Sequence, residues 1–251
     1  MNNHEYAIKA EALLHRYSKS SRPALNGCSL TVRKGEFYGL LGPNGAGKTT
    51  IIALLSGLFP PKGGKIVILG MDLRQHAGII KGSIGLVPQD IALYDNLTAR
   101  ENLAFFGKLY GLGGRQLQNL IADCIHIAAL REHADHRVAT FSGGMKRRLN
   151  LAAGLINTPK ILFLDEPTVG IDAQSRNLIH KQLLQLNQNG TTILYTTHYM
   201  EEAGKLCSRV GIIDSGQLLT EGTPGQLLEQ NGAPDLEALF LLLTGKQLRD
   251  T

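Results

Sequence analysis

Apolar residues follow two spacings along this chain, and their alternation sets the expected fold. Runs of four or five mostly apolar or β-branched residues occur at 37–41, 84–87, 161–164 and 192–196. Such runs are typical of strands buried in a sheet. Between them, apolar residues recur every third or fourth position, as they do on one face of a helix. We therefore expect an α/β core.

The middle of the chain differs from its two ends. The first third predicts strands at 6–14, 28–32, 36–41, 65–69 and 84–87. Residues 97–127 predict helix and open with Thr98 and Glu101, a capping-box pair. Beyond residue 160, strands alternate with a helix over 173–189, a hairpin around Ser215-Gly216 and a short helix from Thr223. The strand-poor middle therefore predicts a helical subdomain inserted into the α/β core.

Composition and charge add little to this pattern. The chain has 251 residues, of which 43% are hydrophobic and 19% charged, so it is typical of a globular protein. Its net charge is +5, and the densest basic cluster is Lys146-Arg147-Arg148. Such a cluster also suits a nucleic-acid or membrane surface. Because no aromatic stacking platform accompanies it, we interpret it as a solvated helix start and expect no nucleic-acid partner.

Residues 42–49 match the phosphate-binding pattern GxxxxGK[ST] in full, between an expected strand and an expected helix. Its glycines allow a tight turn whose N–H groups point at phosphate oxygens, and the following helix adds its dipole. Lys48 would neutralise the β- and γ-phosphates, and Thr49 would offer a hydroxyl to Mg²⁺. The candidate nucleotide ligands are Gly42, Pro43, Asn44, Gly45, Ala46, Gly47, Lys48, Thr49 and Thr50.

Two carboxylates, Asp165 and Glu166, end the apolar run 161–164. Asp165 is placed to help hold Mg²⁺, as the corresponding aspartate does in other P-loop NTPases. Glu166 lies one residue beyond the strand and suits a general base that polarises the attacking water. An Asp-Glu pair is common by itself, but downstream of a phosphate loop it indicates nucleoside triphosphate hydrolysis.

Six short motifs, in a fixed order, resemble those of the ATP-binding cassette (ABC) family. After the phosphate loop, Gln89 looks like the Q-loop glutamine and Ser142-Gly143-Gly144 matches the signature. Asp165-Glu166 then resembles the end of the Walker B strand. Residues 170–172, ending in Asp172, are similar to the D-loop, and His198 resembles the switch histidine. The resemblance covers nearly the whole chain.

The resemblance also suggests roles for these residues. Gln89 would bind Mg²⁺ or the attacking water and report the γ-phosphate to the helical subdomain. His198 would hydrogen-bond the γ-phosphate and help hold Glu166 and the water in line. Tyr17 resembles the aromatic residue that stacks on adenine, although Tyr6 and Tyr38 are also nearby in the sequence.

The signature has a separate role in the family. Ser142 suits the N-cap of a helix starting near Met145, so its hydroxyl and the glycine N–H groups form a second anion site. In the family this site faces the γ-phosphate of a second cassette. The resemblance therefore implies a head-to-tail homodimer or heterodimer in which Ser142, Gly143, Gly144 and Asp172 bind nucleotide across the interface. Met145 departs from the usual glutamine and leaves the phosphate-facing residues intact.

The resemblance implies an α/β fold, that of a P-loop NTPase ABC cassette. This fold has a RecA-like mixed-sheet core, an N-terminal antiparallel β subdomain and an inserted helical subdomain. We expect one ABC ATPase domain over residues 1–251, with the core at about 1–88 and 159–251 and the helical subdomain at about 89–158.

The implied function is the ATP-binding and ATP-hydrolysing subunit of an ABC transporter, with ATP and Mg²⁺ as cofactors. It would act at the cytoplasmic face of the cell membrane as a peripheral protein, with separate integral membrane permease subunits. Residues 141–149, 197–203 and 236–245 resemble the branch that exports drugs, antibiotics or polysaccharides.

Two alternatives remain open. An importer ATPase has the same chemistry and the opposite direction of transport. A soluble ABC ATPase would act on ribosomes or DNA, but translation-factor types carry two cassettes and chromosome or repair types carry long coiled coils. This chain shows one cassette and no heptads.

Overall fold

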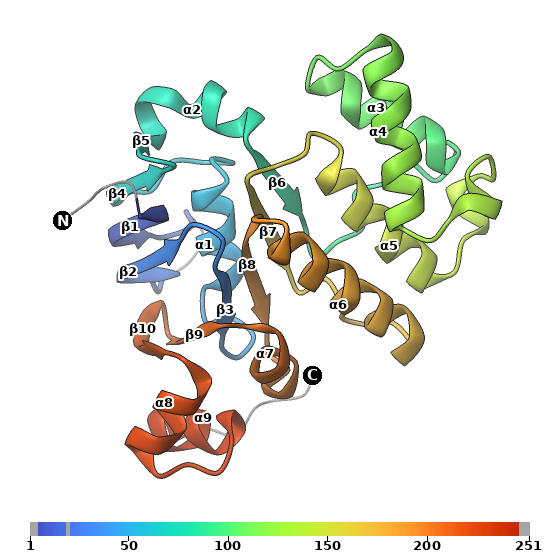
Figure 1. Cartoon of the computed structure of the whole chain (residues 1–251). Coiled ribbons are helices and arrows are strands. Elements are labelled where there is room, and N and C mark those ends of the chain that lie inside the picture. The colour runs from blue at the N-terminus through green and yellow to red at the C-terminus, as the bar shows by residue number, and fades with distance from the viewer. Residues whose placement is uncertain (1–4, 19–20, 246–251) are drawn as a thin grey trace.

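The structure, a computed structural model, describes residues 5–18 and 21–245. The outer ends of the expected domain, 1–4 and 246–251, lie outside the described residues. Two sheets and a set of helices make up the molecule, and one group of helices projects away from both sheets (Figure 1). In the described part of the chain, every helix is too short or too polar to cross a lipid bilayer.

The central sheet has six strands in the order β10-β9-β3-β8-β7-β6. Its strands are β3 (Phe37–Leu41), β6 (Ile84–Val87), β7 (Ile161–Asp165), β8 (Thr192–Thr197), β9 (Arg209–Asp214) and β10 (Gln217–Gly222). All neighbouring pairs run parallel except β9 and β10, which are antiparallel. Every residue of β3, β7 and β8 is buried, as expected for apolar strands covered on both faces. The expected mixed-sheet core is confirmed.

A second, antiparallel sheet is built mostly from the N-terminal part of the chain, in the order β2-β1-β4-β5. Its strands are β1 (Tyr6–His15), β2 (Leu25–Arg33), β4 (Gly63–Ile68) and β5 (Met71–Asp72). One apolar core joins this sheet to helix α1 (Lys48–Leu55) and to the central sheet. Burying α1 in this core fixes the loop that precedes it relative to both sheets.

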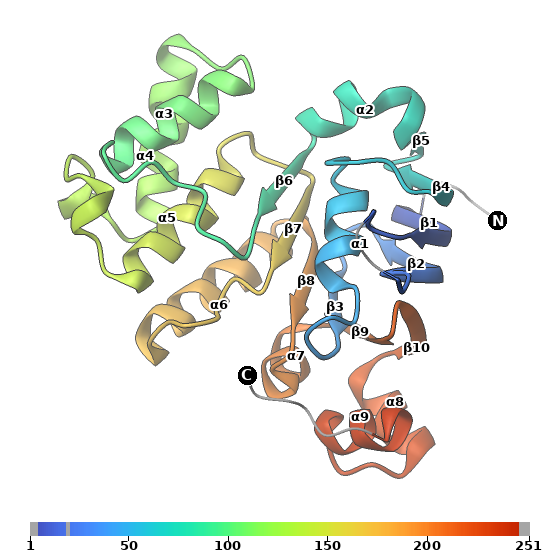
Figure 2. The same ribbon diagram turned by 180° about the vertical axis from the view of Figure 1, so that it is seen from behind.

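Three helices, α3 (Ala99–Leu109), α4 (Gly114–Ile127) and α5 (Gly143–Leu155), form a group that we call the helical lobe. The lobe is drawn in green to yellow; α3 and α4 lie away from the sheets in both views, and α5 connects them to the edge strand β6 (Figures 1 and 2). The capping box of Thr98 and Glu101 is present at the start of α3. The expected helical stretch 97–127 consists of two helices, because a turn at Gly111, with φ of 76°, separates α3 from α4.

Five further helices complete the described chain: α2 (Leu73–Gly82), α6 (Ala173–Gln188), α7 (Met200–Leu206), α8 (Pro224–Asn231) and α9 (Leu236–Thr244). Asp172 is the N-cap of α6, as the sequence predicts. Helices α2 and α7 were absent from the prediction. Both are short and take their stability from packing on the sheets.

The basic cluster at the start of α5 is bound to the rest of the molecule. Lys146 pairs with Asp95 at 2.7 Å, and Arg148 donates hydrogen bonds to two carbonyls just beyond the end of α4. Arg147 lies between them and donates to the backbone carbonyls of Gln89 and Val169. Successive helix positions point about 100° apart, so the three side chains contact three different segments. Our interpretation of this cluster as a solvated helix start is therefore wrong.

Candidate functional site

Four parallel strands deliver the candidate residues to one edge of the central sheet. The phosphate loop, residues 42–49, follows β3, and Gln89 follows β6. Asp165 ends β7 and Glu166 comes next, while His198 follows β8. The carboxyl ends of parallel strands are the usual ligand-binding edge of an open α/β sheet. The topology therefore brings together residues that are far apart in the sequence.

A pocket of about 370 Å³ lies at this edge. Its volume is within the range of small-molecule sites. Except for Ala24, all of its lining residues were predicted from the sequence: Tyr17, Pro43, Asn44, Gly45, Gly47, Lys48, Thr49, Thr50, Gln89 and Glu166. We call this the nucleotide pocket.

The phosphate loop takes a path that only glycine allows at three positions. Gly45 and Gly47 have φ values of 81° and 111°, in the left-handed region. A Cβ on Gly47 would also lie 2.7 Å from the carbonyl oxygen of Ala24, and one on Gly42 would overlap the carbonyl of Ile213. The loop is thus held by close backbone packing at the wall of the nucleotide pocket, and a tight glycine-rich turn of this kind fits an anion.

Three ionisable side chains meet beneath the pocket. The Lys48 ammonium, only 4% exposed, lies 2.9 Å from Glu166 Oε1 and donates to the Gly42 carbonyl at 2.8 Å. The other carboxylate oxygen, Oε2, lies 2.9 Å from His198 Nδ1. Burial makes each of these contacts depend on the others, since an unpaired buried charge is costly. A triphosphate bound in the loop would compete with Glu166 for Lys48.

Thr196 is a residue of this site that sequence reasoning missed. Its hydroxyl donates to Asp165 Oδ1 at 2.7 Å and accepts a hydrogen bond from the N–H of Glu166 at 3.2 Å. Glu166 itself has a φ of 47°, which is uncommon for a residue other than glycine. Thr196 therefore helps hold both carboxylates at the end of β7. Its place one residue before a Thr-His pair at a strand end was the available signal.

The donor set suits Mg²⁺. Thr49 and Gln89 line the nucleotide pocket with a hydroxyl and an amide, and Asp165 adds a carboxylate at the same sheet edge. Within residues 5–18 and 21–245, no three His, Cys, Asp or Glu side chains come together as a metal-binding group. Mg²⁺ at phosphate sites typically uses one or two carboxylates together with phosphate oxygens and waters. These hard oxygen donors fit that ion.

Tyr17 is the one of the three candidate tyrosines that lines the pocket. It is 45% exposed, and its hydroxyl lies 3.2 Å from Thr50 Oγ1. The rings of His15 and Phe59 pack edge-on against it. Tyr38, by contrast, is fully buried and donates to Glu221. Tyr17 therefore offers a ring that is held in place yet open to a flat base.

Replacing Tyr17 by alanine should weaken ATP binding by about 5- to 150-fold, since stacking of a base on an aromatic side chain contributes about 1–3 kcal/mol. Tyr17→Phe keeps the ring and loses only the hydroxyl contact with Thr50, so its affinity should stay within about twofold. Titration of each purified variant with ATP measures the effect. Equal affinities for the alanine and phenylalanine variants would rule out stacking on Tyr17.

Four candidate residues form a second group, away from the nucleotide pocket: Ser142, Gly143, Gly144 and Asp172. Ser142 caps α5 by accepting from the Met145 N–H, and Asp172 caps α6 by accepting from the Ser175 N–H. That N–H also lowers the pKa of Asp172. A Cβ on Gly144 would lie 2.8 Å from Ser175 Cβ, so glycine lets α5 contact α6. The structure thus joins the signature to the D-loop and separates both from the phosphate loop.

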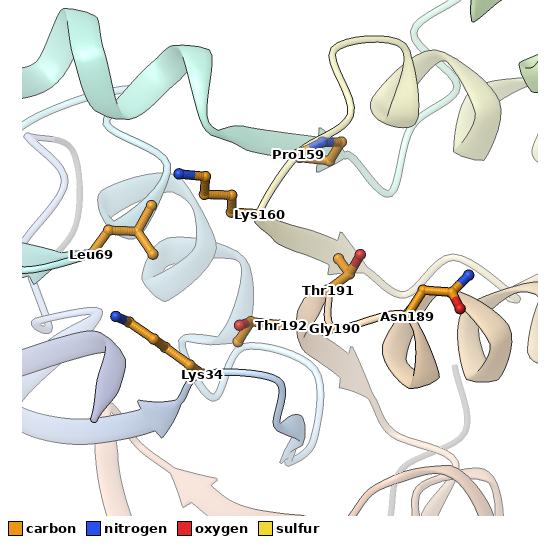
Figure 3. A pocket seen from close by; sticks show the side chains of 8 residues that line it. All are labelled: Lys34, Leu69, Pro159, Lys160, Asn189, Gly190, Thr191 and Thr192. Carbon is orange, nitrogen blue, oxygen red and sulfur yellow. The ribbon is translucent and has the colours of Figure 1, made fainter. Parts of the chain in front are cut away.

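A different pocket, of about 440 Å³, lies at the opposite edge of the central sheet (Figure 3). Lys34 precedes β3, Lys160 precedes β7 and Thr192 begins β8, so this is the amino edge of the parallel strands. None of its lining residues is acidic or a histidine. This pocket lacks the acid–base side chains of the nucleotide pocket, which therefore remains the candidate site.

Sequence comparison identifies a family and individual proteins that are similar to this chain. The profile of the family described as "ABC transporter" matches residues 25–169, more than half of the chain. Linearmycin resistance ATP-binding protein LnrL of Bacillus subtilis (strain 168) is 47% identical over 225 residues, covering 90% of this chain and 72% of that protein. Nod factor export ATP-binding protein I of Rhizobium sp. (strain N33) is 46% identical, covering 82% and 68% of the two chains.

Solved structures agree. The ATP-binding subunit of an ABC transporter superposes with a TM-score of 0.85 at 26% identity, covering 95% of this chain and 99% of that one. A dimeric ATP-binding cassette in a post-hydrolysis state, bound to ADP and Pi, gives a TM-score of 0.79 at 26% identity and covers 86% and 98%. With the phosphate loop, the paired carboxylates and the signature in place, this chain belongs to the ABC transporter family as an ATP-binding cassette.

Proposed function

We propose that this protein is the ATP-hydrolysing subunit of an ABC exporter, bound to separate permease subunits at the cytoplasmic face of the membrane. The observation that carries this proposal is the buried Lys48–Glu166 ion pair beside the phosphate loop, with the half-buried His198 in contact with the same carboxylate. Support for export comes from the relatives, which include a linearmycin resistance protein and Nod factor export proteins.

In this proposal each residue of the cluster has a separate task. Lys48 moves from Glu166 to the β- and γ-phosphates when ATP enters, because the phosphates carry the larger negative charge. Glu166 is then free to accept a proton from the attacking water. The imidazole of His198, 2.9 Å from the carboxylate, orients Glu166 and adds a hydrogen bond at the γ-phosphate.

Magnesium would be held by Thr49, Asp165 and Gln89, and would supply positive charge at the phosphate oxygens when bound. Gln89 has a second connection, because Arg147 of the helical lobe donates to its backbone carbonyl. The presence of the γ-phosphate at Gln89 would in this way reach α5. All regular elements between β6 and β7 are helical. We therefore propose a core at about 1–88 and 159–251 and a helical subdomain at about 89–158.

The active form would be a head-to-tail dimer with a second cassette. Ser142 and Gly143 are exposed at the start of α5, Gly144 follows them, and all three lie outside the nucleotide pocket. A helix N-terminus with free N–H groups suits a phosphate, and the partner's phosphate loop would supply one. Solved cassettes related to this chain include a dimer bound to ADP and Pi.

The permease would bind at an apolar groove between the core and the helical lobe. This groove, about 520 Å³ in volume, lies between the ends of α1 and α2 on one side and the end of α3 on the other. Leu58 and Leu109 in its lining are 63% and 68% exposed, which is high for large apolar side chains. An amphipathic helix from a cytoplasmic loop of the permease fits such a groove.

Leu109→Glu should release the protein from membranes that contain its permease. The permease candidate is the product of the neighbouring reading frame, if that product has about six apolar stretches of roughly 20 residues. A charge placed in the groove would oppose docking, whereas ATP hydrolysis by the purified chain should stay near wild type. Membrane fractionation with and without the co-expressed permease measures the effect.

Leu242→Glu serves as the matched control, because Leu242 is 66% exposed on α9 and lies outside the groove lining. Release of this variant together with retention of Leu109→Glu would place the docking surface elsewhere. If the wild-type chain never fractionates with membranes that hold the permease, the transporter function itself fails.

A further inference from the structure

A buried carboxylate, Glu202, lies in the first turn of α7, directly after the loop that carries His198. Its Oε2 accepts hydrogen bonds from the hydroxyls of Tyr195 at 2.7 Å and Thr168 at 2.9 Å. The two hydroxyls also lie 3.1 Å from each other. All three residues are under 9% exposed, so the contacts form a closed polar triangle inside the protein.

This triangle connects the two loops that carry the proposed catalytic pair. Thr168 lies two residues after Glu166, in the turn that leaves β7, and is only 1% exposed. Tyr195 lies on β8, three residues before His198. One carboxylate oxygen therefore fixes the spacing between the Glu166 loop and the His198 loop, whose side chains must meet at 2.9 Å.

The second oxygen of Glu202 extends the connection to the start of α6. Arg176 Nε lies 3.3 Å from Glu202 Oε1. The two groups form an ion pair, but the N–H does not point at the oxygen well enough for a hydrogen bond. The N–H of Arg176 bonds the carbonyl of Asp172, in the first turn of α6. Its guanidinium also lies over the ring of Tyr199, 5.6 Å from the centroid, and that ring stacks beside His198 at 4.2 Å.

The charge state of Glu202 fits this arrangement. Burial by itself raises the pKa of the carboxyl, but the nearby imidazole of His180, 3.7 Å away, and hydrogen bonds from Tyr195 and Thr168 outweigh burial and hold the pKa of Glu202 below its ordinary value. The carboxylate is therefore ionised at neutral pH and acts as a strong acceptor for both hydroxyls. Burial and the nearby charge in turn raise the pKa of Tyr195, which keeps its hydroxyl as a donor.

We propose that Glu202 is a positioning residue for ATP hydrolysis. It holds the loop of Glu166 at the correct distance from His198, acting through Thr168 and Tyr195. Glu202 also pairs with Arg176 in the first turns of α6, where the D-loop meets the signature. Through this pair, the distance between Glu166 and His198 depends on the position of α6. This inference rests on the proposed roles of Glu166 and His198 and goes beyond them, since Glu202 lies outside the lining of the nucleotide pocket.

Thr168→Val, Tyr195→Phe and Glu202→Gln test the triangle, because each removes a hydroxyl or a charge with little change in volume. Each should lower kcat for ATP by roughly ten- to a hundredfold, since small misplacements of catalytic groups have effects of this size. The KM for ATP should stay within about twofold, because the phosphate loop is untouched. Thr168→Ser, which retains the hydroxyl, should recover most of the activity.

Glu201→Gln is the matched control. Glu201 lies next to Glu202 on α7, but its side chain is 83% exposed and it pairs with the exposed Lys205. The same chemical change there should leave kcat and the melting temperature unaltered. Wild-type kcat in Thr168→Val, which loses only the hydroxyl and keeps the methyl group, would overturn the proposal.

A double-mutant cycle with His198→Ala separates positioning from simple stability. If Glu202 acts by placing Glu166 relative to His198, then Glu202→Gln should lower single-turnover hydrolysis much less in the His198→Ala background than in the wild type. Equal losses in both backgrounds would refute the inference. Failure of the catalytic assignment is recognised separately, by normal hydrolysis in Glu166→Gln.

Discussion

Glu166→Gln is expected to keep ATP binding and to reduce steady-state hydrolysis by about 10²- to 10⁴-fold, the usual contribution of a general base. The amide has nearly the same shape as the carboxylate but cannot take a proton from water. It also removes the ion pair with Lys48, so the lysine is released to the phosphates. ATP affinity should therefore be equal to or higher than that of the wild type, and an ATP-bound dimer should accumulate.

Two measurements check this result. Phosphate release under saturating ATP reports hydrolysis, and a sizing column run with ATP reports the dimer. Glu201→Gln provides the control, because the same substitution on an exposed residue should change neither. Normal hydrolysis by Glu166→Gln would show that another group is the base.

Lys48→Met should have the second-largest effect, a loss of ATP affinity of about 10- to 150-fold, because a hydrogen bond to a charged group contributes about 1.5–3 kcal/mol. In the structure this ammonium is buried and bonded to the carbonyls of Gly42 and Pro43, so it is fixed beside the phosphate loop before a nucleotide arrives. Hydrolysis should fall further than binding, since the charge on the γ-phosphate oxygens is redistributed in the transition state.

The variant also leaves Glu166 with one charged partner fewer, which should lower the free energy of unfolding by about 1–3 kcal/mol. The double variant Lys48→Met/Glu166→Gln removes both charges of the pair. It should recover the melting temperature without recovering ATP affinity, whereas Glu166→Gln alone binds ATP. If the double variant binds ATP as tightly as Glu166→Gln does, Lys48 has no role in nucleotide binding.

Much of the site was predictable because its chemistry depends on residues that are close in sequence. The path of the phosphate loop is set by local glycine conformations. The apolar run 161–164 predicts a buried strand, and the two carboxylates lie at and just after its end. Cap residues such as Asp172 act within one helical turn. The parallel topology then brings the strand ends to one edge, as sheets of this kind do.

What escaped prediction depends on contacts between distant segments. Thr196 acts by hydrogen-bonding Asp165 of β7, and Arg148 acts by hydrogen-bonding a carbonyl just beyond α4. Neither contact can be seen in the residues adjacent in sequence. Helix α7 has seven residues, too few for an apolar repeat to be seen. The position of the break between α3 and α4 was not predicted, because apolar spacing continues on both sides of the turn at Gly111.

The contact made by Arg147 has a practical consequence for studies of the Q-loop. Both of its acceptors, at Gln89 and Val169, are backbone carbonyls, so they persist whatever side chain those positions carry. Replacing Gln89 therefore removes its amide from the nucleotide pocket while the bond that ties the lobe to the core stays in place. Under the proposed function, variants at Gln89 would test sensing of the nucleotide alone, and variants at Arg147 would test how that signal reaches the lobe.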